Sequence, residues 1–517
     1  MICTAFYEGF WIIPIMKRDK VSLKANAFSN WFLLAINVGI GFFLTPFIIN
    51  NLGNSRYGIW TLVNSVIGYY GIINLGVGSA VTRYIALYTG KKDSGAINEI
   101  ASTTFVMFTV TAAIVTGFSL IFAGIFADFF NVDEYQKNEF INTIIILGTT
   151  TGITFISNVF TAILTSREHY ISVNFFSSIL TLTRAILIVV FVHNGFGITG
   201  VASATLAVSI LQLIIKLVLY NYLLPDIKIS FKSIKRNTLK ILVLYGGITT
   251  IIQIADILRI NIDSLVIGRF LTLEAVGIYG VAALLLRYMG KVIISGVSVL
   301  NPRFSNLAGS GDSDEQKRLL FKSLQLASFI SFGMTLFAIA FGPHFIIFWV
   351  GEEFVEASYV LIIVSAAYAF DLAQSPSIAL LYAKNKHKYY AFYIILEGVA
   401  NLLLSIILVQ KLGMTGVAIG TAIPMLISKC IVMPLYVCKV LDLSLKNYLK
   451  PFSIPLALSL IFLTTIYSTG LSNIISNNDQ VIFSVSACTV GAVYMIIALM
   501  FMYRGSLITL LKSIFNL

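Results

Sequence analysis

Charged side chains are scarce in this chain of 517 residues. Asp, Glu, Lys and Arg make up 11% of it, whereas hydrophobic residues make up 58%. Soluble domains usually contain about 25% charged residues, so this composition excludes a soluble globular protein. Lipid requires every backbone polar group to be paired within the protein. The long apolar runs therefore predict an all-α polytopic membrane protein.

Residue patterns of enzymes and metal sites are also lacking. Glycine-rich nucleotide loops and the HExxH and GxSxG motifs do not occur, and the histidines are dispersed in or near loops. The four cysteines, Cys3, Cys430, Cys438 and Cys488, have neither disulfide nor metal-ligand spacing. We therefore expect no enzyme, no catalytic residue, no metal and no cofactor. Transport against a concentration gradient would have to be driven by an ion gradient or the membrane potential.

Apolar runs long enough to cross a bilayer recur along the whole chain. A spanning helix needs about 20 apolar residues, and runs of that length separated by polar residues predict about fourteen transmembrane helices. Their expected positions are 28–49, 57–82, 101–127, 141–165, 171–192, 198–222, 241–268, 275–300, 319–342, 357–383, 389–410, 414–437, 451–470 and 481–503.

Basic residues gather in alternate loops rather than in one patch. The net charge of +12 would suit nucleic acid, but short loops rich in Lys and Arg are the pattern of the cytoplasmic side of a membrane protein. The few basic residues in the opposite loops are Arg56, Lys137, Arg269 and Lys411. We expect both termini in the cytoplasm and no nucleic-acid partner.

The N-terminal residues Met1–Met16 are apolar, but they are short and lack a basic start. They therefore do not predict a cleavable signal peptide. The run Met16-Lys-Arg-Asp-Lys20 is typical of a natural start, so Met16 is an alternative to Met1 as the first residue, and the sequence does not decide between them.

One segment of the chain occurs twice. Gly197-Ile-Thr-Gly-Val-Ala-Ser-Ala-Thr205 is similar to Gly413-Met-Thr-Gly-Val-Ala-Ile-Gly-Thr421, and similar turns, Ser166–Tyr170 and Lys384–Lys388, precede them. Two copies of a six-helix unit would have the same orientation, because six is even. The predicted parts are a cytoplasmic tail (1–24), an N-lobe (25–223), a basic cytoplasmic linker (224–240), a C-lobe (241–440) and an accessory helix pair with the C-terminal tail (441–517).

Five charged residues lie in two neighbouring apolar runs. Asp256, Arg259 and Asp263 share one helical face, and Arg287 and Lys291 are four residues apart. A charge at the centre of a membrane helix costs about 2.5–3.5 kcal/mol, so these side chains should face one another or water. We predict that they line a polar path for an anionic substrate. The alternative is a structural ion pair, for example Asp256 with Arg259.

Further charges fall inside other predicted spans. Basic groups suit phosphate or pyrophosphate, because Arg offers a bidentate fork and Lys a point charge. Arg184 is placed near mid-membrane by the helical rise and is therefore a candidate substrate-binding residue. The remaining charges of this kind are Arg83, Lys216, Asp371, Glu397 and Lys429.

Several short motifs occur in a characteristic order and spacing. They are Leu52-Gly53, Tyr57-Gly-Ile-Trp60, Leu75-Gly-Val-Gly78, Arg83-Tyr-Ile-Ala86, Asp263–Gly268, Val276-Gly-Ile-Tyr279 and Leu300–Ser305. In order and spacing they resemble the signature of bacterial polysaccharide-unit (Wzx-type) flippases, of the multidrug/oligosaccharidyl-lipid/polysaccharide (MOP) superfamily. The resemblance implies a MATE-like fold of two six-helix lobes plus an accessory pair.

The resemblance implies a function in surface polysaccharide synthesis. Such proteins flip an undecaprenyl-pyrophosphate-linked oligosaccharide unit across the cytoplasmic membrane, for O-antigen, capsule or exopolysaccharide, by alternating access. Their central cavity is cationic, and Arg83, Arg259, Arg287 and Lys291 are the matching candidates for binding the pyrophosphate. The implied partners are the lipid-linked oligosaccharide, membrane lipids, H⁺ or Na⁺, and a polysaccharide polymerase with chain-length proteins. The candidate ion-coupling residues are Asp256, Asp263 and Glu397.

Three other functions stay open at this point. A cation or drug antiporter of the same fold would use Asp256, Asp263 or Asp371 as its ion-sensitive site. A lipid II flippase is not distinguished by the fold. A membrane polysaccharide polymerase or glycosyltransferase is disfavoured, because it would need a large outer loop or a soluble domain, and this sequence contains neither.

Overall fold

The computed structural model of the chain describes residues 23–74, 77–298, 300–310, 312–469 and 480–503, and these contain no β-strand. The two alternative starts, Met1 and Met16, and two signature residues, Leu75 and Gly76, lie outside these ranges. For some helical residues, among them Asp256 and Arg259, only the backbone is described. The chain divides into two compact units, Met1–Ile257 and Leu258–Leu517. We refer to them as the first and the second unit.

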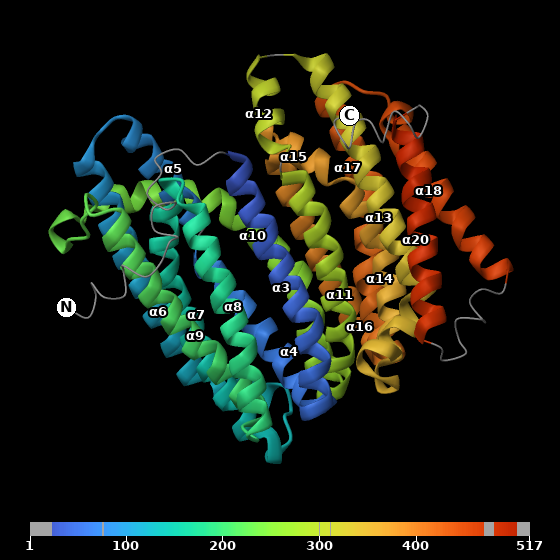
Figure 1. The fold of residues 1–517 in the computed structure, drawn as a ribbon, viewed down its shortest axis with the longest axis horizontal. Helices are drawn as coiled ribbons and strands as arrows, with labels where there is room; N and C mark the ends of the chain where they lie inside the picture. The colour runs from blue at the N-terminus through green and yellow to red at the C-terminus, as the bar shows by residue number, and fades with distance from the viewer. Residues whose placement is uncertain (1–22, 75–76, 299, 311, 470–479, 504–517) are drawn as a thin grey trace. The chain divides into compact units, whose positions relative to one another are not determined.

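The first unit is built from long helices joined by short turns (Figure 1). Helix α7 packs against α6 and α9, and α8 packs against α3 and α9. The elements are α3 (Leu23–Leu52), α4 (Asn54–Gly68), a 3-10 turn (Tyr69–Asn74), α5 (Val77–Gly90), α6 (Ser94–Phe129), α7 (Glu134–Ser166), α8 (Tyr170–His193), α9 (Gly197–Leu223), a 3-10 turn (Phe231–Ser233) and the first part of α10 (Arg236–Phe270).

The second unit contains the end of α10 and the remaining helices. Helix α13 is central in it, because it packs against α14 and α18. The elements are α11 (Leu273–Ser298), α12 (Asn301–Ser310), α13 (Ser313–Val350), a 3-10 turn (Glu352–Phe354), α14 (Glu356–Ala373), α15 (Ser375–Ala383), α16 (His387–Ile427), a π-helical turn (Ser428–Val432), α17 (Met433–Leu441), α18 (Leu445–Ser468) and α20 (Gln480–Tyr503).

Each predicted span falls on one or more of these helices. Within the described ranges, eleven helices are long and apolar enough to cross a membrane. The predicted all-α polytopic class is thereby confirmed. The predicted division into tail, lobes, linker and accessory pair stays a prediction.

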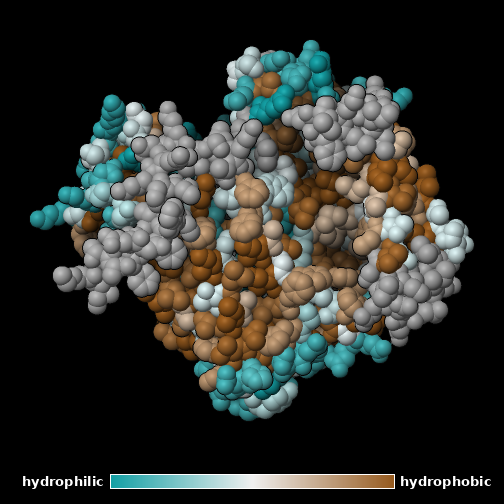
Figure 2. All heavy atoms as spheres, viewed as in Figure 1, coloured by the Kyte–Doolittle hydropathy of each residue, from teal (hydrophilic) through white to brown (hydrophobic). Residues whose placement is uncertain are grey.

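The exterior of the helices is apolar over much of its area. Figure 2 shows hydrophobic residues over the middle of the helices and hydrophilic residues at their ends. On α6 alone, Leu120, Ile121 and Ile125 are 56%, 69% and 57% exposed. An apolar surface of this kind is typical of contact with a membrane or another apolar partner, and lipid is the partner that fits helices of spanning length.

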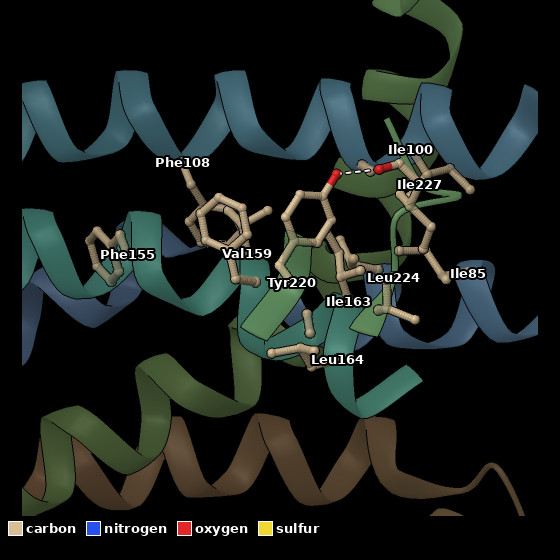
Figure 3. Close-up of a cluster of buried hydrophobic side chains, with 14 of the residues drawn as sticks. Ile85, Ile100, Phe108, Phe155, Val159, Ile163, Leu164, Tyr220, Leu224 and Ile227 are labelled. Carbon is tan, nitrogen blue, oxygen red and sulfur yellow. Dashed lines mark hydrogen bonds between the residues drawn. The ribbon is translucent and has the colours of Figure 1, made fainter. Parts of the chain in front are cut away.

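The chain after α9 folds back onto the first unit. The Tyr220 hydroxyl donates a hydrogen bond of 2.5 Å to the backbone oxygen of Ile227, inside a buried cluster formed with α5, α6 and α7 (Figure 3). The Lys235 ammonium lies 2.7 Å from the Glu99 carboxylate, and this hydrogen bond raises the pKa of Lys235 above its ordinary value. The basic segment that leads to α10 is therefore attached to the first unit.

The repeated segment begins with a glycine of positive φ in both copies. Gly197 and Gly413 have φ values of +58° and +56°, a left-handed conformation that glycine adopts without the steric cost of a Cβ atom. The preceding turns also match, since Glu168 and Asn385 have φ values of +64° and +56°. The similarity found in the sequence therefore extends to the local structure.

Two predicted spans contain a local break in the helix. The span 57–82 is interrupted by the 3-10 turn Tyr69–Asn74. The span 357–383 is confirmed as one candidate membrane span, Glu356–Ala383, with a break at Gln374. In the second case Pro376 follows the break, and proline has no N–H to donate to the preceding turn. Both breaks lie within apolar runs, which is why hydropathy alone did not separate the pieces.

Candidate functional site

Asp263 lies at the centre of a buried polar cluster in the second unit. Its carboxylate accepts hydrogen bonds from the Tyr279 hydroxyl at 2.5 Å, the Thr421 hydroxyl at 2.9 Å and the Asn401 amide at 3.2 Å. The Asn401 oxygen in turn accepts from the hydroxyls of Ser405 at 2.9 Å and Thr421 at 3.2 Å. All five side chains are at least 95% buried. We call them the Asp263 cluster.

Three helices hold the Asp263 cluster together. Asp263 is on α10 and Tyr279 on α11, whereas the other three members are on α16. Helix α16 turns sharply at Gly413, and this turn brings Thr421 back beside Asn401. Gly420 permits the close approach, because a Cβ atom there would lie 2.5 Å from the Ser405 hydroxyl.

The Asp263 cluster presents oxygen atoms of several kinds. The Thr421 hydroxyl lies within hydrogen-bond distance of the Asp263 carboxylate and of the Asn401 amide oxygen. The Ser405 hydroxyl lies within that distance of the same amide oxygen. The Val417 backbone oxygen lies 3.1 Å from the Thr421 hydroxyl. Hard cations prefer such oxygen ligands. Among the described side chains, the hydrogen-bond partners of Asp263 are all neutral.

Glu397 lies in a second buried polar group one helical turn from Asn401. The Lys429 ammonium lies 3.0 Å from the Asp371 carboxylate and 3.8 Å from the Glu397 carboxylate. Lys429 belongs to the π-helical turn, and its backbone oxygen accepts a hydrogen bond of 2.5 Å from the Gln374 side chain. Buried ion pairs of this geometry join helices, here α14, α16 and the π-helical turn.

The predicted basic residues are distributed over both units. Arg287 and Lys291 are exposed on one face of α11, and the Lys291 ammonium lies 5.9 Å from the centre of the Tyr288 ring. Arg83 is exposed on α5. Arg184 is half-buried on α8, and its Nε atom has no hydrogen-bond acceptor among the described residues. Their role in binding substrate stays a prediction.

The side chains of Asp256 and Arg259 lie outside the part of the chain that the structure describes. Their predicted roles, and the predicted pairing of the two, therefore stay predictions. Both positions are on helix α10, one or two turns before Asp263, as their spacing indicated.

Sequence reasoning missed most of the Asp263 cluster. Asn401, Ser405 and Tyr279 are ordinary polar residues of membrane helices, and nothing in their spacing marks them. Two signals were present. Asn401 and Ser405 continue the face of Glu397 at intervals of four residues, and Thr421 ends the repeated segment.

Comparison with known proteins identifies the family. The family described as "Polysaccharide biosynthesis protein" matches residues 52–359. The chain belongs to this family. The match covers more than half of the chain and includes α4 to α13, so the resemblance to polysaccharide-unit flippases is confirmed.

One relative and two solved structures extend this finding. A Shigella flexneri protein named "Putative O-antigen transporter" is 24% identical over 418 residues, which is 80% of this chain and 98% of that protein. A structure of lipid II flippase MurJ in an inward closed conformation has a TM-score of 0.72 at 15% identity, over 93% of this chain and 99% of MurJ. An inward-facing multidrug resistance MATE family transporter of the MOP superfamily has a TM-score of 0.67 at 16% identity, over 80% and 96%. The chain thus has the MOP fold.

Proposed function

We propose that this protein is a flippase for a lipid-linked oligosaccharide. It moves an undecaprenyl-pyrophosphate-linked repeat unit across the cytoplasmic membrane for O-antigen, capsule or exopolysaccharide synthesis. The observation that carries the proposal is the family match over residues 52–359. The similarity over nearly the whole Shigella flexneri protein supports it.

The substrate's pyrophosphate is the proposed ligand of the basic residues. Arg83, Arg287 and Lys291 are exposed, and Arg184 and Arg259 complete the proposed set of a cationic central cavity. Guanidinium and ammonium groups recognise phosphate oxygens through charge-assisted hydrogen bonds. A cationic lining favours an anionic lipid carrier over the cationic drugs that acidic sites would bind.

Ion coupling is the proposed role of the Asp263 cluster. Its carboxylate, amide, hydroxyl and backbone oxygens suit Na⁺, and a proton on Asp263 is the alternative. Binding of a positive charge there removes the cost of a buried unpaired carboxylate, which gives the ion a means to favour one conformation. Asp256 and Glu397 remain proposed coupling residues, the latter through its ion pair with Lys429.

The proposed setting is the cytoplasmic (inner) membrane of a cell that exports glycan. Both termini lie in the cytoplasm, and the two lobes alternate in access to its two sides. A polysaccharide polymerase and chain-length proteins would receive the flipped unit.

A deletion strain provides the test. We expect loss of surface polysaccharide and accumulation of lipid-linked units inside the cell, and full restoration by the wild-type gene. The double variant Arg287→Ala/Lys291→Ala should restore little, because the pyrophosphate loses two cationic ligands. Lys450→Ala is the matched control, since Lys450 is an exposed lysine at the start of α18, and it should restore display fully.

Other outcomes would favour a different function. Unchanged polysaccharide in the deletion strain, together with greater sensitivity to cationic drugs, would replace the flippase with a drug antiporter. Depletion of cell-wall precursor on the outer leaflet would instead indicate a lipid II flippase. Full activity of the double variant at wild-type protein levels would remove Arg287 and Lys291 from the substrate site.

A further inference from the structure

A lysine is buried in the first unit without a charged partner. Lys216 is 6% exposed on α9, its Nζ atom is not completely enclosed, and its side chain has no hydrogen bond or ion pair among the described residues. It is the one charged residue of the segment Gly197–Leu223. An ammonium group in such surroundings is costly unless it is paired or neutral.

The position of Lys216 relative to α7 follows from contacts at both ends of the two helices. Near the start of α9, the Ile198 amide donates a hydrogen bond of 3.1 Å to the Glu139 carboxylate of α7. Beyond their other ends, Arg167 forms an ion pair of 3.1 Å with Asp226. In both contacts the partners are 59 residues apart in sequence. The two helices therefore run side by side with a constant offset.

This offset places Ser157 opposite Lys216. These two residues are also 59 positions apart. Ser157 lies eighteen residues after Glu139, and Lys216 lies eighteen residues after Ile198. Eighteen residues make about five whole turns of an α-helix. Ser157 therefore lies on the same face of α7 as Glu139, and Lys216 lies on the same face of α9 as Ile198.

Aromatic packing next to this position confirms that the helices are still in contact there. The ring centres of Phe160 and Tyr220 lie 5.3 Å apart. Phe160 follows Ser157 by three residues and Tyr220 follows Lys216 by four, which is about 5–6 Å along each helix axis. Figure 3 shows Tyr220 of α9 beside Val159 and Ile163 of α7. The surroundings on this side of Lys216 are thus apolar.

Ser157 is itself a buried hydroxyl without a hydrogen bond. Its side chain is fully buried, and its oxygen has no partner among the described residues. A charged lysine donates only, whereas a neutral amine also accepts a hydrogen bond from a hydroxyl. Buried polar atoms without partners are rare in native proteins, and each one needs an explanation.

The charged groups of α7 and α4 are distant from this level. On α7, Arg167 is ten residues away, or about 15 Å along the axis, and Glu139 is about 27 Å away. On α8, Arg184 carries the same sign as a protonated lysine. On α4, Arg56 lies at the Glu139 end, where it pairs with that carboxylate at 3.0 Å. By the offset of the two helices, Ser157 is the polar side chain of α7 at the level of Lys216, and the two do not form a hydrogen bond in this structure.

We propose that Lys216 is a proton site, which gains a proton in one conformation of the transport cycle and releases it in another. Ser157, which makes no hydrogen bond in this structure, is its hydrogen-bond partner in one of those conformations. A proton is the ligand that needs no cavity between two packed helices. Proton binding by Lys216 involves residues of the first unit. The coupling of this proton to transport rests on the proposed function. The site is separate from the Asp263 cluster, which belongs to the second unit.

Thermal unfolding of the purified full-length protein tests proton binding directly. Lys216→Met keeps the volume and removes the ammonium, so its melting temperature should exceed that of the wild type. The excess should be larger in acidic than in alkaline buffer, because only the protonated lysine places a charge among apolar side chains. Lys228→Met, at an exposed lysine, is the matched control and should show no such dependence.

Complementation of the deletion strain tests coupling. Lys216→Met fixes the position as neutral and Lys216→Arg fixes it as charged, since arginine does not release its proton in proteins. Both should lose surface polysaccharide, although the first is more stable than the wild type. Full activity of either variant would overturn coupling through this lysine.

Two further outcomes would overturn the proton site itself. An excess melting temperature that does not depend on pH shows that Lys216 keeps one charge state. An excess that falls as chloride or phosphate is added shows that a small anion neutralises the lysine. If the wild-type gene fails to restore polysaccharide, the proposed function is at fault, and the unfolding data still decide whether Lys216 binds a proton.

Discussion

At the scale of single residues, Asp263 is the charged group whose surroundings are best defined. Its described hydrogen-bond partners are the neutral side chains of Tyr279, Asn401 and Thr421. Three donors stabilise the carboxylate, but none of them neutralises it. A carboxylate held in this way is suited to bind and release a cation, because neutral ligands do not compete for its charge.

The Asp263→Asn variant should therefore lose its response to Na⁺. A ligand that binds only the folded state raises stability with its concentration, so Na⁺ should raise the melting temperature of the wild type more than K⁺ does. The substituted amide keeps the shape of the carboxylate but not its charge, and the shift should vanish. Thermal unfolding in detergent at constant ionic strength measures this.

Asp314→Asn is the control for this experiment, since Asp314 is an exposed acid in the first turn of α13, and it should respond to Na⁺ as the wild type does. An undiminished Na⁺ response of Asp263→Asn would place the ion site elsewhere. A response to acid in place of Na⁺, lost in the same variant, would make the proton the coupling ion.

Single residues also show what the sequence can and cannot predict about a site. Asp263 was predicted because a charge inside an apolar run is costly and rare. Its partners were not, because Asn401 and Thr421 are 138 and 158 residues away along the chain. Uncharged polar residues are common in membrane helices, and only the packing of α10 against α16 reveals which of them meet the carboxylate.

At the scale of elements, the turn at Gly413 decides where Thr421 lies. Gly413 has a φ of +56°, and a Cβ atom there would meet no other atom within 4 Å. Its ψ is −138°, and residues with a side chain rarely adopt this combination of φ and ψ. Gly413→Ala should therefore act through backbone strain alone, at a cost of about 1–3 kcal/mol. We expect a lower melting temperature and, because the turn positions Thr421, a smaller Na⁺ response.

Gly117→Ala provides the matched comparison for that prediction. Gly117 lies inside α6, and a Cβ atom there also meets nothing within 4 Å. Alanine in a helix is favoured over glycine by about 1 kcal/mol, so this variant should be as stable as the wild type or more so. Equal effects of the two substitutions would show that the conformation of Gly413 is not what matters.

Helix boundaries were predicted well where the end of an apolar run coincides with a helix-breaking residue such as glycine. The predicted boundary between the spans 389–410 and 414–437 falls at Gly413, where α16 does turn. The interruptions at Tyr69–Asn74 and Gln374 were missed, because apolar residues continue through both. The π-helical turn Ser428–Val432 was missed for a related reason, since it depends on how Lys429 and Gln374 pair across helices.

At the scale of the whole molecule, the loops carry a charge asymmetry that predicts orientation. Acidic residues such as Asp133 and Glu353 lie in one set of turns, and basic residues such as Lys386 lie in the other. Lys and Arg near the ends of spans are retained on the cytoplasmic side. The helices of both units place these turns between consecutive spans, as an alternating path through the membrane requires.

Labelling of single cysteines in intact cells would measure this orientation. In a variant whose four native cysteines are replaced, Asp133→Cys and Glu353→Cys should react with a membrane-impermeant maleimide added outside, because their turns are exposed and expected to face outward. Lys386→Cys and Asp312→Cys should react only after the cells are opened. Labelling of Lys386→Cys in intact cells would reverse the orientation, and the positive charges of the loops would then need another explanation, such as binding of an acidic partner at the outer face.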